Sequence, residues 1–245
     1  MKIWIVLPAY NEELALPPLF EAIHSCLPQS NLEYEVIVVN DGSTDNTEEV
    51  TKNYSSKQPI LLVNQPQNCG LAKTIQLGLT EASSRANKDD VIVAMDADFT
   101  HPPQLILPML DYIEEGYDVV IASRYVPGSR VLGVPFYRKV LSGTASWLFR
   151  LCFPTPNVRD FTCGYRAYRA SVLQTLVKDY NGEFVSQQGF SCMVEILLHL
   201  RKQKAKMQEV PLDLRYDRKP GASKLKIFKT IFETLEIIWR NLKNR

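Results

Sequence analysis

Short apolar runs alternate with amphipathic stretches along the first half of the chain. The predicted strands are Ile3–Leu7, Glu35–Asn40, Ile60–Val63, Val91–Met95 and Val119–Ala122. The predicted helices run from Leu14 to Leu27 and over Thr44–Tyr54, Leu71–Ala82 and Pro103–Glu115. Because the strands are continuously apolar and helices separate them, the pattern predicts a parallel sheet covered on both faces. Ligands of such sheets bind beyond the carboxyl ends of the strands.

The composition is typical of a soluble globular protein. The chain has 245 residues, 45% hydrophobic and 22% charged, and this length buries a core without disulfides. Its five cysteines form no C-x-x-C pair, which favours a reducing compartment. No apolar run approaches the roughly 20 residues needed to cross a bilayer, and the amino terminus does not have the pattern of a signal peptide.

The net charge of +1 hides an asymmetry between the two halves of the chain. Residues 1–122 carry 6 basic and 18 acidic side chains, whereas residues 123–245 carry 22 basic and 9 acidic ones. The surplus of basic residues in the second half predicts a surface that meets anions, such as phosphates or a membrane face. Two oppositely charged, solvated faces of one globule are the simpler alternative.

Several widespread sequence motifs are missing. The chain contains no G-x-G-x-x-G dinucleotide fingerprint, no G-x-x-x-x-G-K-[ST] phosphate loop and no G-x-S-x-G nucleophile elbow. These classes of nucleotide-binding protein and hydrolase are therefore excluded. No nucleic-acid partner is expected.

Polar clusters follow three of the predicted strands. They are residues 8–13, 40–45 and 96–98, and all three should meet at one edge of the sheet. Helix capping is the simpler explanation for the Ser, Thr and Asp residues of the second cluster. It does not easily explain Asp96 and Asp98, which flank a small residue at the end of a buried strand. Paired carboxylates suit Mg²⁺ or Mn²⁺, which are commonly shared with substrate phosphates.

Seven motifs together give the chain a family resemblance. L-P-A-Y-N-E-E at 7–13, V-N-D-G-S-T-D-N-T at 39–47, N-C-G-L-A-K at 68–73 and M-D-A-D-F-T-H-P-P at 95–103 resemble the family 2 glycosyltransferases. I-A-S-R-Y at 121–125, R-D-F-T-C-G-Y-R-A-Y at 159–168 and R-K-P-G-A-S-K at 218–224 resemble the dolichol-phosphate mannosyltransferase-like, or polyprenyl-phosphate glycosyltransferase, branch. The resemblance implies an α/β GT-A fold, in which a mostly parallel sheet is flanked by helices, with amphipathic helices at the C-terminus. It also implies a nucleotide-sugar donor, a divalent metal and inversion at the sugar carbon.

The resemblance also implies roles for individual residues. Those that would bind the donor are Pro8, Tyr10, Glu12 and Asp41, with Asp41 on the side of the base. Those that would hold the diphosphate and the metal are Asp96, Ala97 and Asp98, with Asp98 the principal ligand and a catalytic residue. Those that would contact the donor sugar or phosphates are Arg124, Arg138, Arg218 and Lys224, and Arg124 is the second catalytic candidate.

One position departs from the pattern of the mannosyltransferases. These commonly have Leu-Gln after the second aspartate, and the Gln can help to hold the metal, whereas this chain has Phe99 and Thr100. Thr100 is therefore a candidate metal ligand through its hydroxyl or a water. The change leaves the donor open between the GDP-mannose and UDP-glucose classes.

A lipid phosphate acceptor agrees with the charge distribution. A phosphate monoester is largely a dianion at neutral pH, because its second pKa is about 6, so it can attack without a general base. Such an enzyme needs cations to position two phosphorylated substrates, and the guanidinium fork of arginine binds two oxygens at once. We therefore expect Arg124, Arg138 and Lys224 to position the phosphates. An isolated surface ion pair is the alternative for each of them.

Two stretches have the pattern of a membrane-surface helix. Val131–Phe153 and Ser223–Leu242 combine Trp, Phe and Leu with Lys and Arg, and the second has helical spacing. Packing on the sheet is the alternative for Ser223–Leu242. We expect a glycosyltransferase domain over 1–220 and a basic amphipathic helix over 221–245, which either faces the membrane or packs on the domain. The protein should be cytoplasmic and peripheral at the cytoplasmic face of a membrane, and a small membrane subunit is a further candidate partner.

Three other functions remain open from the sequence. The chain could transfer sugar to a hydroxyl of a glycan or glycolipid, although no E-D or D-D pair after Asp98 offers an obvious base. It could also be a catalytically silent subunit that binds a nucleotide sugar at a membrane and scaffolds another protein. A nucleotidyltransferase is disfavoured because no glycine-rich basic loop follows the first strand.

Overall fold

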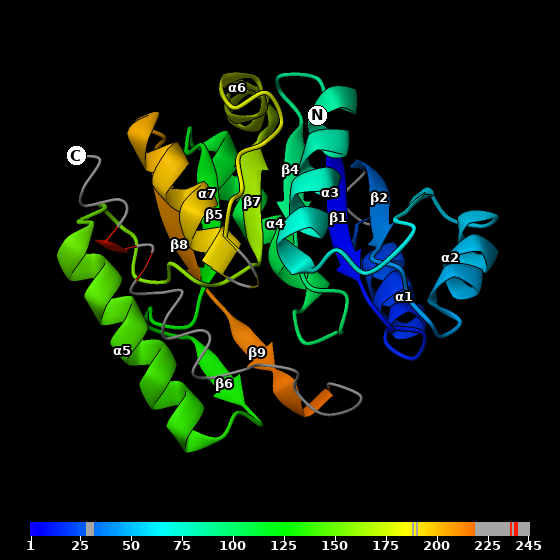
Figure 1. Cartoon of the computed structure of the whole chain (residues 1–245), viewed down its shortest axis with the longest axis horizontal. Helices are drawn as coiled ribbons and strands as arrows, with labels where there is room; N and C mark the ends of the chain where they lie inside the picture. Colours follow the sequence, from blue (N-terminus) through cyan, green and yellow to red (C-terminus); the bar gives the residue numbers. More distant parts are fainter. Residues whose placement is uncertain (28–31, 188, 190, 219–235, 237, 240–245) are drawn as a thin grey trace.

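A seven-stranded sheet forms the centre of the molecule, with the strand order β3-β2-β1-β4-β7-β5-β8 (Figure 1). The computed structural model describes residues 1–27, 32–187, 189, 191–218, 236, 238 and 239. The strands of this sheet are β1 (Lys2–Ala9), β2 (Glu33–Asn40), β3 (Ile60–Asn64), β4 (Val91–Ala94), β5 (Val119–Ser123), β7 (Arg166–Arg169) and β8 (Met207–Pro211). The five strands predicted from the first half of the sequence are all present.

The sheet is mostly parallel, but one strand runs in the opposite direction. β1 pairs in parallel with β2 and β4, and β5 pairs in parallel with β8. β7 lies antiparallel between β4 and β5, so that Arg166 stands opposite both Ala94 and Ile121. The mostly parallel sheet that the family resemblance implies is therefore confirmed, and β7 is its antiparallel strand. This strand is short and has an arginine at each end, so it does not have the apolar pattern that marks the other central strands.

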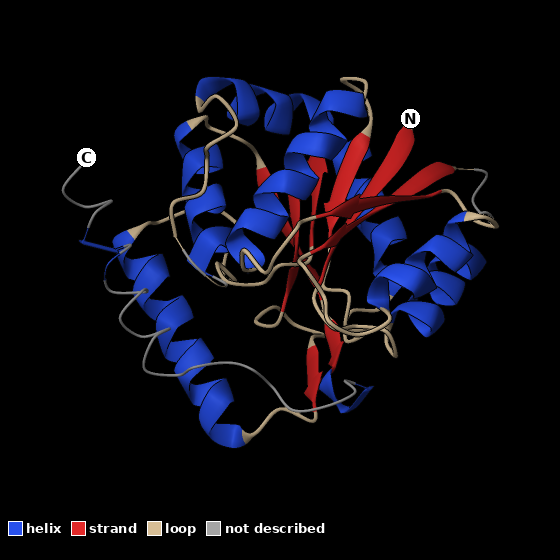
Figure 2. Cartoon of the chain, turned by 45° about the vertical axis from the view of Figure 1, so that its right-hand side comes forward, coloured by secondary structure: helices blue, strands red, loops and turns tan. Residues whose placement is uncertain are grey.

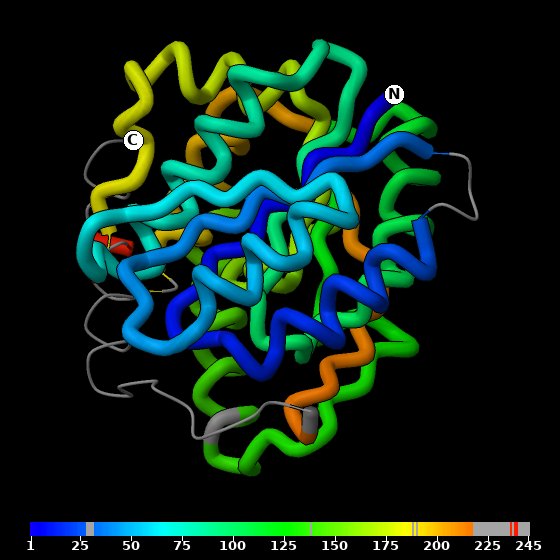
Figure 3. The backbone as a smooth tube through the Cα atoms, turned by 90° about the vertical axis from the view of Figure 1, so that its right-hand side faces the viewer, coloured from blue at the N-terminus to red at the C-terminus, as the bar shows by residue number. Residues whose placement is uncertain are grey.

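Helices cover both faces of the sheet (Figure 2). The helices are α1 (Leu16–Cys26), α2 (Thr47–Ser55), α3 (Leu71–Arg85), α4 (Ile106–Glu114), α5 (Phe136–Cys152), α6 (Ala170–Asp179) and α7 (Ser191–Lys202), with the short 3₁₀ turns η2 (Pro103–Leu105) and η3 (Tyr216–Arg218). α3 packs on β1, β2 and β4, and α6 joins α3 to α7 in the same layer. α1, α2 and α4 pack on the other face, and α1 and α2 lie toward the viewer in Figure 3.

Helix α3 packs closely against β1. Gly78 of α3 lies so close to the sheet that a Cβ atom there would stand 2.4 Å from Val6 Cγ1. Val6 and its neighbours Ile5 and Leu7 are fully buried. Because protein interiors are close-packed, this contact fixes the distance between helix and strand and the position of the loop before α3.

A small second sheet and helix α5 extend beyond the carboxyl end of β5 and β8. β6 (Arg130–Leu132) pairs in parallel with β9 (Asp213–Arg215), and α5 lies beside them (Figure 1). Of the predicted helix over 221–245, only residues 236, 238 and 239 are within the described residues. None of the helices that the structure describes is long and apolar enough to cross a membrane.

Candidate active site

The loops after β1 and β2 are joined by hydrogen bonds between side chains and backbone. Asn11, which has a positive φ of 56°, accepts a hydrogen bond from the Thr44 N–H at 2.8 Å, and its own N–H donates to Ser43 Oγ at 3.0 Å. The Glu12 N–H donates to Thr47 Oγ1 at 2.8 Å. Asn tolerates this left-handed backbone better than most residues. The predicted polar clusters at 8–13 and 40–45 therefore lie together, as expected.

The predicted donor-binding residues of the first loop lie at this same edge. Pro8 is buried in β1 opposite Val39, whereas Tyr10 and Glu12 follow the strand and are half-buried. The Glu12 carbonyl accepts hydrogen bonds from the N–H groups of Ala15 and Leu16, which turns the chain into α1. The structure thus brings these residues to the carboxyl end of the sheet, and their contact with a donor stays a prediction.

Asp41 anchors the loop that leads into α3. Its Oδ1 accepts hydrogen bonds from Gln65 Nε2 at 2.9 Å and from the Cys69 N–H at 2.7 Å, and its Oδ2 accepts one from the Gly70 N–H at 3.0 Å. The carboxyl group is buried. Since a carboxylate has about four acceptor sites, these three bonds give Asp41 a structural role whether or not it also contacts a base.

The acidic pair after β4 forms a compact turn. Asp98 Oδ1 accepts a hydrogen bond from the Thr100 hydroxyl at 2.7 Å and another from the Thr100 N–H at 3.2 Å. Phe99, between them, has a positive φ of 59°. Asp98, Thr100 and Ala97 are buried, whereas the Asp96 side chain is 25% exposed. Thr100 therefore lies beside Asp98, as a candidate metal ligand must.

His101 is hydrogen-bonded to the backbone of the acidic turn. Its Nδ1 accepts a hydrogen bond from the Asp96 N–H at 3.2 Å, so the ring carries its proton on Nε2 when neutral. Nε2 lies 3.9 Å from Asp96 Oδ2. The ring is stacked on Tyr165 with centroids 5.0 Å apart, and the Tyr165 hydroxyl donates to the Pro102 carbonyl at 3.0 Å. These contacts fix where the Asp96 carboxylate stands.

Arg124, at the end of β5, is held by a buried carboxylate. Its Nε donates to Asp160 Oδ2 at 2.7 Å, and its Nη2 donates to Asp160 Oδ1 at 2.7 Å and to Thr162 Oγ1 at 2.6 Å. The Arg124 N–H also donates to Asp160 Oδ2 at 3.1 Å. The Asp160 side chain is fully buried, whereas that of Arg124 is 20% exposed. This two-oxygen geometry fixes the plane of the guanidinium.

The electrostatics of this pair keep both groups charged. Burial favours the neutral form of each, but the opposite charges stand at hydrogen-bond distance. The Arg124 charge and N–H donors therefore lower the pKa of Asp160, and the Asp160 charge raises the pKa of Arg124. Burial and the Asp160 charge raise the pKa of the neighbouring Cys163 thiol to about 12, so this thiol stays neutral.

The antiparallel strand β7 explains why the two parts of the site meet. Because β7 runs opposite to β4 and β5, its leading loop, residues 159–165, arrives at the edge where β4 and β5 end. Asp160 and Thr162 of this loop hold Arg124. At Gly164 a Cβ atom would stand only 3.4 Å from Asp96 Oδ1. One loop therefore holds the arginine and passes close to the acidic turn.

Asp160 and Thr162 belong to one of the seven sequence motifs, but neither was predicted to have a role in the site. One sequence signal could have revealed Asp160: it is an acidic residue next to the basic Arg159, in a segment that otherwise consists of apolar and small residues. A partner 36 residues away from Arg124 is not visible in local patterns. Glu209, which also contacts this loop, was missed for the same reason.

Three predicted cations are described incompletely or not at all. Arg138 lies in the first turns of α5 and Arg218 in η3, but the positions of their side chains are outside the described part of the chain. Lys224 lies outside the described residues. The Thr100 carbonyl accepts a hydrogen bond from the Arg215 N–H at 3.0 Å, so the strand leading to Arg218 crosses next to the acidic turn.

The donor atoms at the acidic turn suit a hard divalent cation. They are the carboxylates of Asp96 and Asp98 with the hydroxyl of Thr100, all oxygens. Within the residues that the structure describes, no three His, Cys, Asp or Glu side chains gather to hold a metal ion. Mg²⁺ in proteins commonly completes its coordination with waters and substrate phosphates.

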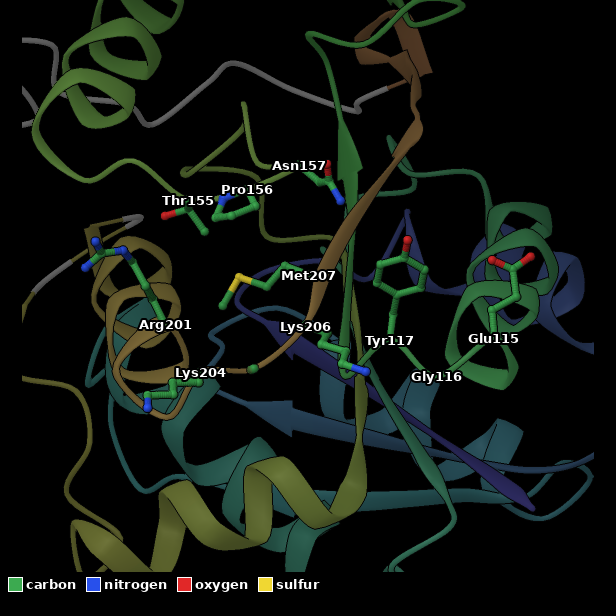
Figure 4. Close-up of a pocket in the computed structure, with 11 residues that line it drawn as sticks. Glu115, Gly116, Tyr117, Thr155, Pro156, Asn157, Arg201, Lys204, Lys206 and Met207 are labelled. Carbon is green, nitrogen blue, oxygen red and sulfur yellow. The ribbon is translucent and has the colours of Figure 1, made fainter.

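A separate pocket lies at the opposite end of β5 and β8, where these strands begin (Figure 4). It measures about 620 Å³, and its lining includes Glu115, Tyr117, Arg201, Lys204 and Lys206. Arg201 Nε donates to the Pro154 carbonyl at 3.3 Å. None of the predicted site residues whose side chains the structure describes lines this pocket, so it is distinct from the acidic turn and from Arg124.

The fold and these motifs place the chain in a known family. A family model described as glycosyl transferase family 2 matches residues 4–177, and the chain belongs to this family. The dolichol-phosphate mannosyltransferase of Pyrococcus furiosus is 37% identical over 244 residues, which are 99% of this chain and 64% of that protein. The polyprenol monophosphomannose synthase of Mycolicibacterium smegmatis is 31% identical over 223 residues, or 90% of this chain and 80% of that protein.

A solved structure shares the fold. Glucosyl-3-phosphoglycerate synthase from Mycobacterium tuberculosis, in complex with Mn²⁺, uridine diphosphate and phosphoglyceric acid, aligns with a TM-score of 0.67 at 18% identity. The alignment covers 97% of this chain and 76% of that chain. The predicted GT-A fold and the predicted glycosyltransferase family are thus confirmed. This chain spans slightly less than two thirds of the length of the Pyrococcus furiosus relative.

Proposed function

We propose that this chain transfers a hexose from a nucleoside diphosphate sugar to a polyprenyl phosphate, with inversion at the sugar carbon and with Mg²⁺ or Mn²⁺. The observation that carries this proposal is the single loop that joins the acidic turn at Asp96 to the fixed guanidinium of Arg124. An acidic turn suits a metal-bound diphosphate, and a fixed arginine suits a phosphate. The names of the two similar relatives, a dolichol-phosphate mannosyltransferase and a polyprenol monophosphomannose synthase, support a lipid phosphate acceptor.

On the donor side, the loops after β1 and β2 form the nucleotide pocket. Pro8, Tyr10, Glu12 and Asp41 line it, with Asp41 on the side of the base. Asp98 and Asp96 would hold the divalent cation, with Thr100 beside them, and a cation bound there would supply positive charge next to the diphosphate of the donor. The Mn²⁺ in the mycobacterial synthase, a protein of the same fold, agrees with this choice of cation.

On the acceptor side, arginine and lysine position the lipid phosphate for attack. A phosphate oxygen forms a bond to the anomeric carbon while the bond from that carbon to the diphosphate oxygen breaks. The phosphate is already a dianion at neutral pH, so no proton has to be removed. A single displacement of this kind inverts the sugar carbon. Arg124 contacts the transferred sugar or the phosphates, and Arg138, Arg218 and Lys224 complete the cationic surface.

Helix α5 supplies the surface that meets the membrane. Large apolar side chains are exposed at helical spacing along one side, at Phe136 (81%), Val140 (50%), Trp147 (59%) and Leu151 (64%). On the opposite side, Ser146 and Phe149 are buried against the domain, and Phe149 stacks on Phe161 with centroids 5.6 Å apart. Lys139 and Arg150 are exposed on the same helix. Apolar side chains flanked by cations suit an anionic bilayer surface, and we place the protein at the cytoplasmic face.

The reaction is tested with purified protein, radiolabelled GDP-mannose or UDP-glucose, and polyprenyl phosphate in detergent. We expect label to enter the lipid with one of the donors, to stop with EDTA and to return with Mn²⁺ or Mg²⁺. Equal transfer to lipids that end in a hydroxyl instead of a phosphate would contradict the acceptor. Metal-dependent binding of a nucleotide sugar without transfer to any acceptor would indicate a silent subunit.

The membrane surface is tested by sedimentation with vesicles of phosphatidylcholine and phosphatidylglycerol. The double variant Phe136→Ser, Trp147→Ser should bind vesicles more weakly than the unchanged protein while keeping the same melting temperature. Phe149→Ala is the matched control, because it changes the buried side of the same helix and should lower the melting temperature. Equal vesicle binding by the double variant and the unchanged protein would contradict the role of α5.

A further inference from the structure

Glu209 places a carboxyl group in the interior beneath the candidate active site. It lies in β8 opposite Ile121 of β5, and only 7% of its surface is exposed. Its Oε1 accepts hydrogen bonds from the Asp160 N–H at 2.6 Å and from the Arg159 N–H at 2.7 Å. In the described part of the chain, no partner lies within hydrogen-bond distance of its buried Oε2, although the Ser123 hydroxyl is near enough to lower the pKa of the carboxyl group.

A carboxyl group in this position lowers the stability of the folded protein. Burial without full hydrogen bonding destabilises a polar group, and an apolar side chain would fill the same space without that cost. Its neighbours in β8, Met207 and Val210, are buried apolar residues. Burial, and to a lesser extent the Asp160 charge, also raise the pKa of Glu209, although the two N–H donors and the Ser123 hydroxyl oppose this shift. Packing of β8 therefore does not account for a glutamate at 209.

The contacts of Glu209 lead directly to Arg124. The two N–H groups that donate to Glu209 belong to Arg159 and Asp160, the first two residues of the 159–165 loop. The second of them, Asp160, is fully buried and holds the Arg124 guanidinium through both carboxylate oxygens. β8 is thereby linked to the end of β5 through the loop, in addition to the strand pairing. The geometry of the Arg124 fork depends on where the backbone at Asp160 stands.

We propose that Glu209 is a positioning residue that fixes the backbone at Asp160 and so sets the orientation of the Arg124 guanidinium in the active site. Its effect on transfer rests on the function proposed above, in which Arg124 contacts the sugar or the phosphates. A displacement of about 1 Å of a positioning group can lower a rate by about 100-fold. Loss of the Oε1 acceptor should therefore affect catalysis more than it affects substrate binding.

The orientation of Arg124 is measured without any substrate. In the protein labelled with ¹⁵N, the Nε–H of Arg124 should give a signal protected from solvent exchange, because it donates to the buried Asp160. Its assignment comes from Arg124→Lys, which removes it. Glu209→Leu should broaden or remove the signal, and Glu209→Gln should keep it, because the amide oxygen can still accept both N–H bonds.

A matched control separates this effect from general loosening of a loop. Glu195 in α7 also accepts two backbone N–H groups, from Ser186 at 2.7 Å and from Gln187 at 2.9 Å. Glu195→Leu should therefore leave the Arg124 signal unchanged. Loss of the signal in Glu209→Gln, or its persistence in a folded Glu209→Leu, would overturn the proposal. If Glu209→Leu does not fold, Glu209→Gln still tests the proposal, because the proposal requires the Arg124 Nε–H signal to be present in that variant.

A double-mutant cycle then connects the position of Arg124 to transfer. Glu209→Leu should lower kcat by about 10-fold or more in the unchanged background, with a smaller effect on KM, and much less in the Arg124→Lys background. Equal effects in the two backgrounds would show that Glu209 acts only on stability and would overturn the proposal. If the Arg124 signal depends on Glu209 but Arg124→Lys transfers sugar normally, the positioning stands and the function assigned to Arg124 fails.

Discussion

The two sides of the candidate active site are built in different ways. On the side of β1 and β2, short loops are held by hydrogen bonds of Asn11, Ser43 and Asp41 to backbone groups of neighbouring loops. On the side of β5 and β8, the site is held by buried charged groups, Arg124, Asp160 and Glu209, which come from segments far apart in the sequence.

This difference has a physical consequence. Hydrogen bonds that join surface loops each contribute modestly to stability, about 1 kcal/mol. A buried ion pair is different, because removing one partner leaves an uncompensated charge in the interior. The first side should tolerate single changes at Asn11 or Ser43 with small losses of stability, whereas the buried carboxylate of Asp41 should tolerate change less. The second side should respond as a unit, because its charges depend on one another.

The largest effect is expected where the two sides meet, at the acidic turn. Asp98→Asn should lower the rate of sugar transfer by at least about 100-fold, because outer-shell residues of metal sites alone are worth about 10- to 100-fold. The measurement is initial rate at saturating Mn²⁺. Asp111→Asn in α4, which removes an exposed acid of the same type, should leave the rate unchanged. A rate near normal in Asp98→Asn would show that this carboxylate holds no essential cation.

The second largest effect concerns the buried ion pair. Asp160→Asn should lower the free energy of unfolding by about 3 kcal/mol, because the Arg124 charge then loses its partner. Denaturation by urea measures this. Glu81→Gln is the matched control, since Glu81 pairs with Arg85 at 2.6 Å on the surface of α3. That change should cost only about 0.5 kcal/mol. Similar losses for both variants would contradict the difference between the two sides.

A third prediction tests how tightly the loop after β2 is built. Gly42 has a positive φ of 62°, and a Cβ atom there would stand 2.4 Å from the Gln67 carbonyl carbon. Gly42→Ala should therefore lower the free energy of unfolding by more than about 1 kcal/mol. Gly116→Ala, which also has a positive φ but no atom within 4 Å of the added Cβ, should cost less. Urea denaturation compares the two, and equal losses would mean that backbone conformation alone matters.

The smallest effect is a pH dependence on the charged side. The pKa of Glu209 is raised above its ordinary value of 4.5, chiefly by burial, so folding favours its neutral form. Its contribution to stability is therefore present below pH 4.5 and is lost as the pH rises through the raised pKa. As the pH rises from 4.5 to above the raised pKa, the unchanged protein should therefore lose stability relative to Glu209→Gln. The expected loss in the free energy of unfolding is about 1.4 kcal/mol for each unit by which folding raises the pKa.

The pKa of Asp160 is lowered, so its contribution has the opposite sign. It is present above the ordinary value of 3.8 and is lost as the pH falls through the lowered pKa. The comparison with Glu209→Gln isolates the first effect, because both proteins keep Asp160 and Arg124. Unfolding by urea at a series of pH values measures the difference. A difference that does not vary with pH would mean that Glu209 titrates alike in the folded and unfolded states.

The first half of the sheet was accessible from sequence because its signals are local. A buried strand reads as a continuous apolar run, and the polar residues that follow it mark the carboxyl edge of the sheet. Asp96, Asp98 and Asp41 could therefore be placed together from the sequence alone. β7 and β8 could not be predicted in this way, since β7 carries two arginines and β8 contains Glu209.

By itself, the sequence determined the family, the alternation of strands and helices, and the loops that carry the acids, since each depends on residues that are neighbours in the chain. Only the tertiary structure decided that Arg124 faces Asp160 and that Glu209 supports their loop. The physical reason is the direction of β7, which is set by pairing with β4 and β5 and brings residues 159–165 back to the site. Long-range pairing of buried charges leaves no periodic trace in the sequence, because each partner meets its counterpart only after the sheet has formed.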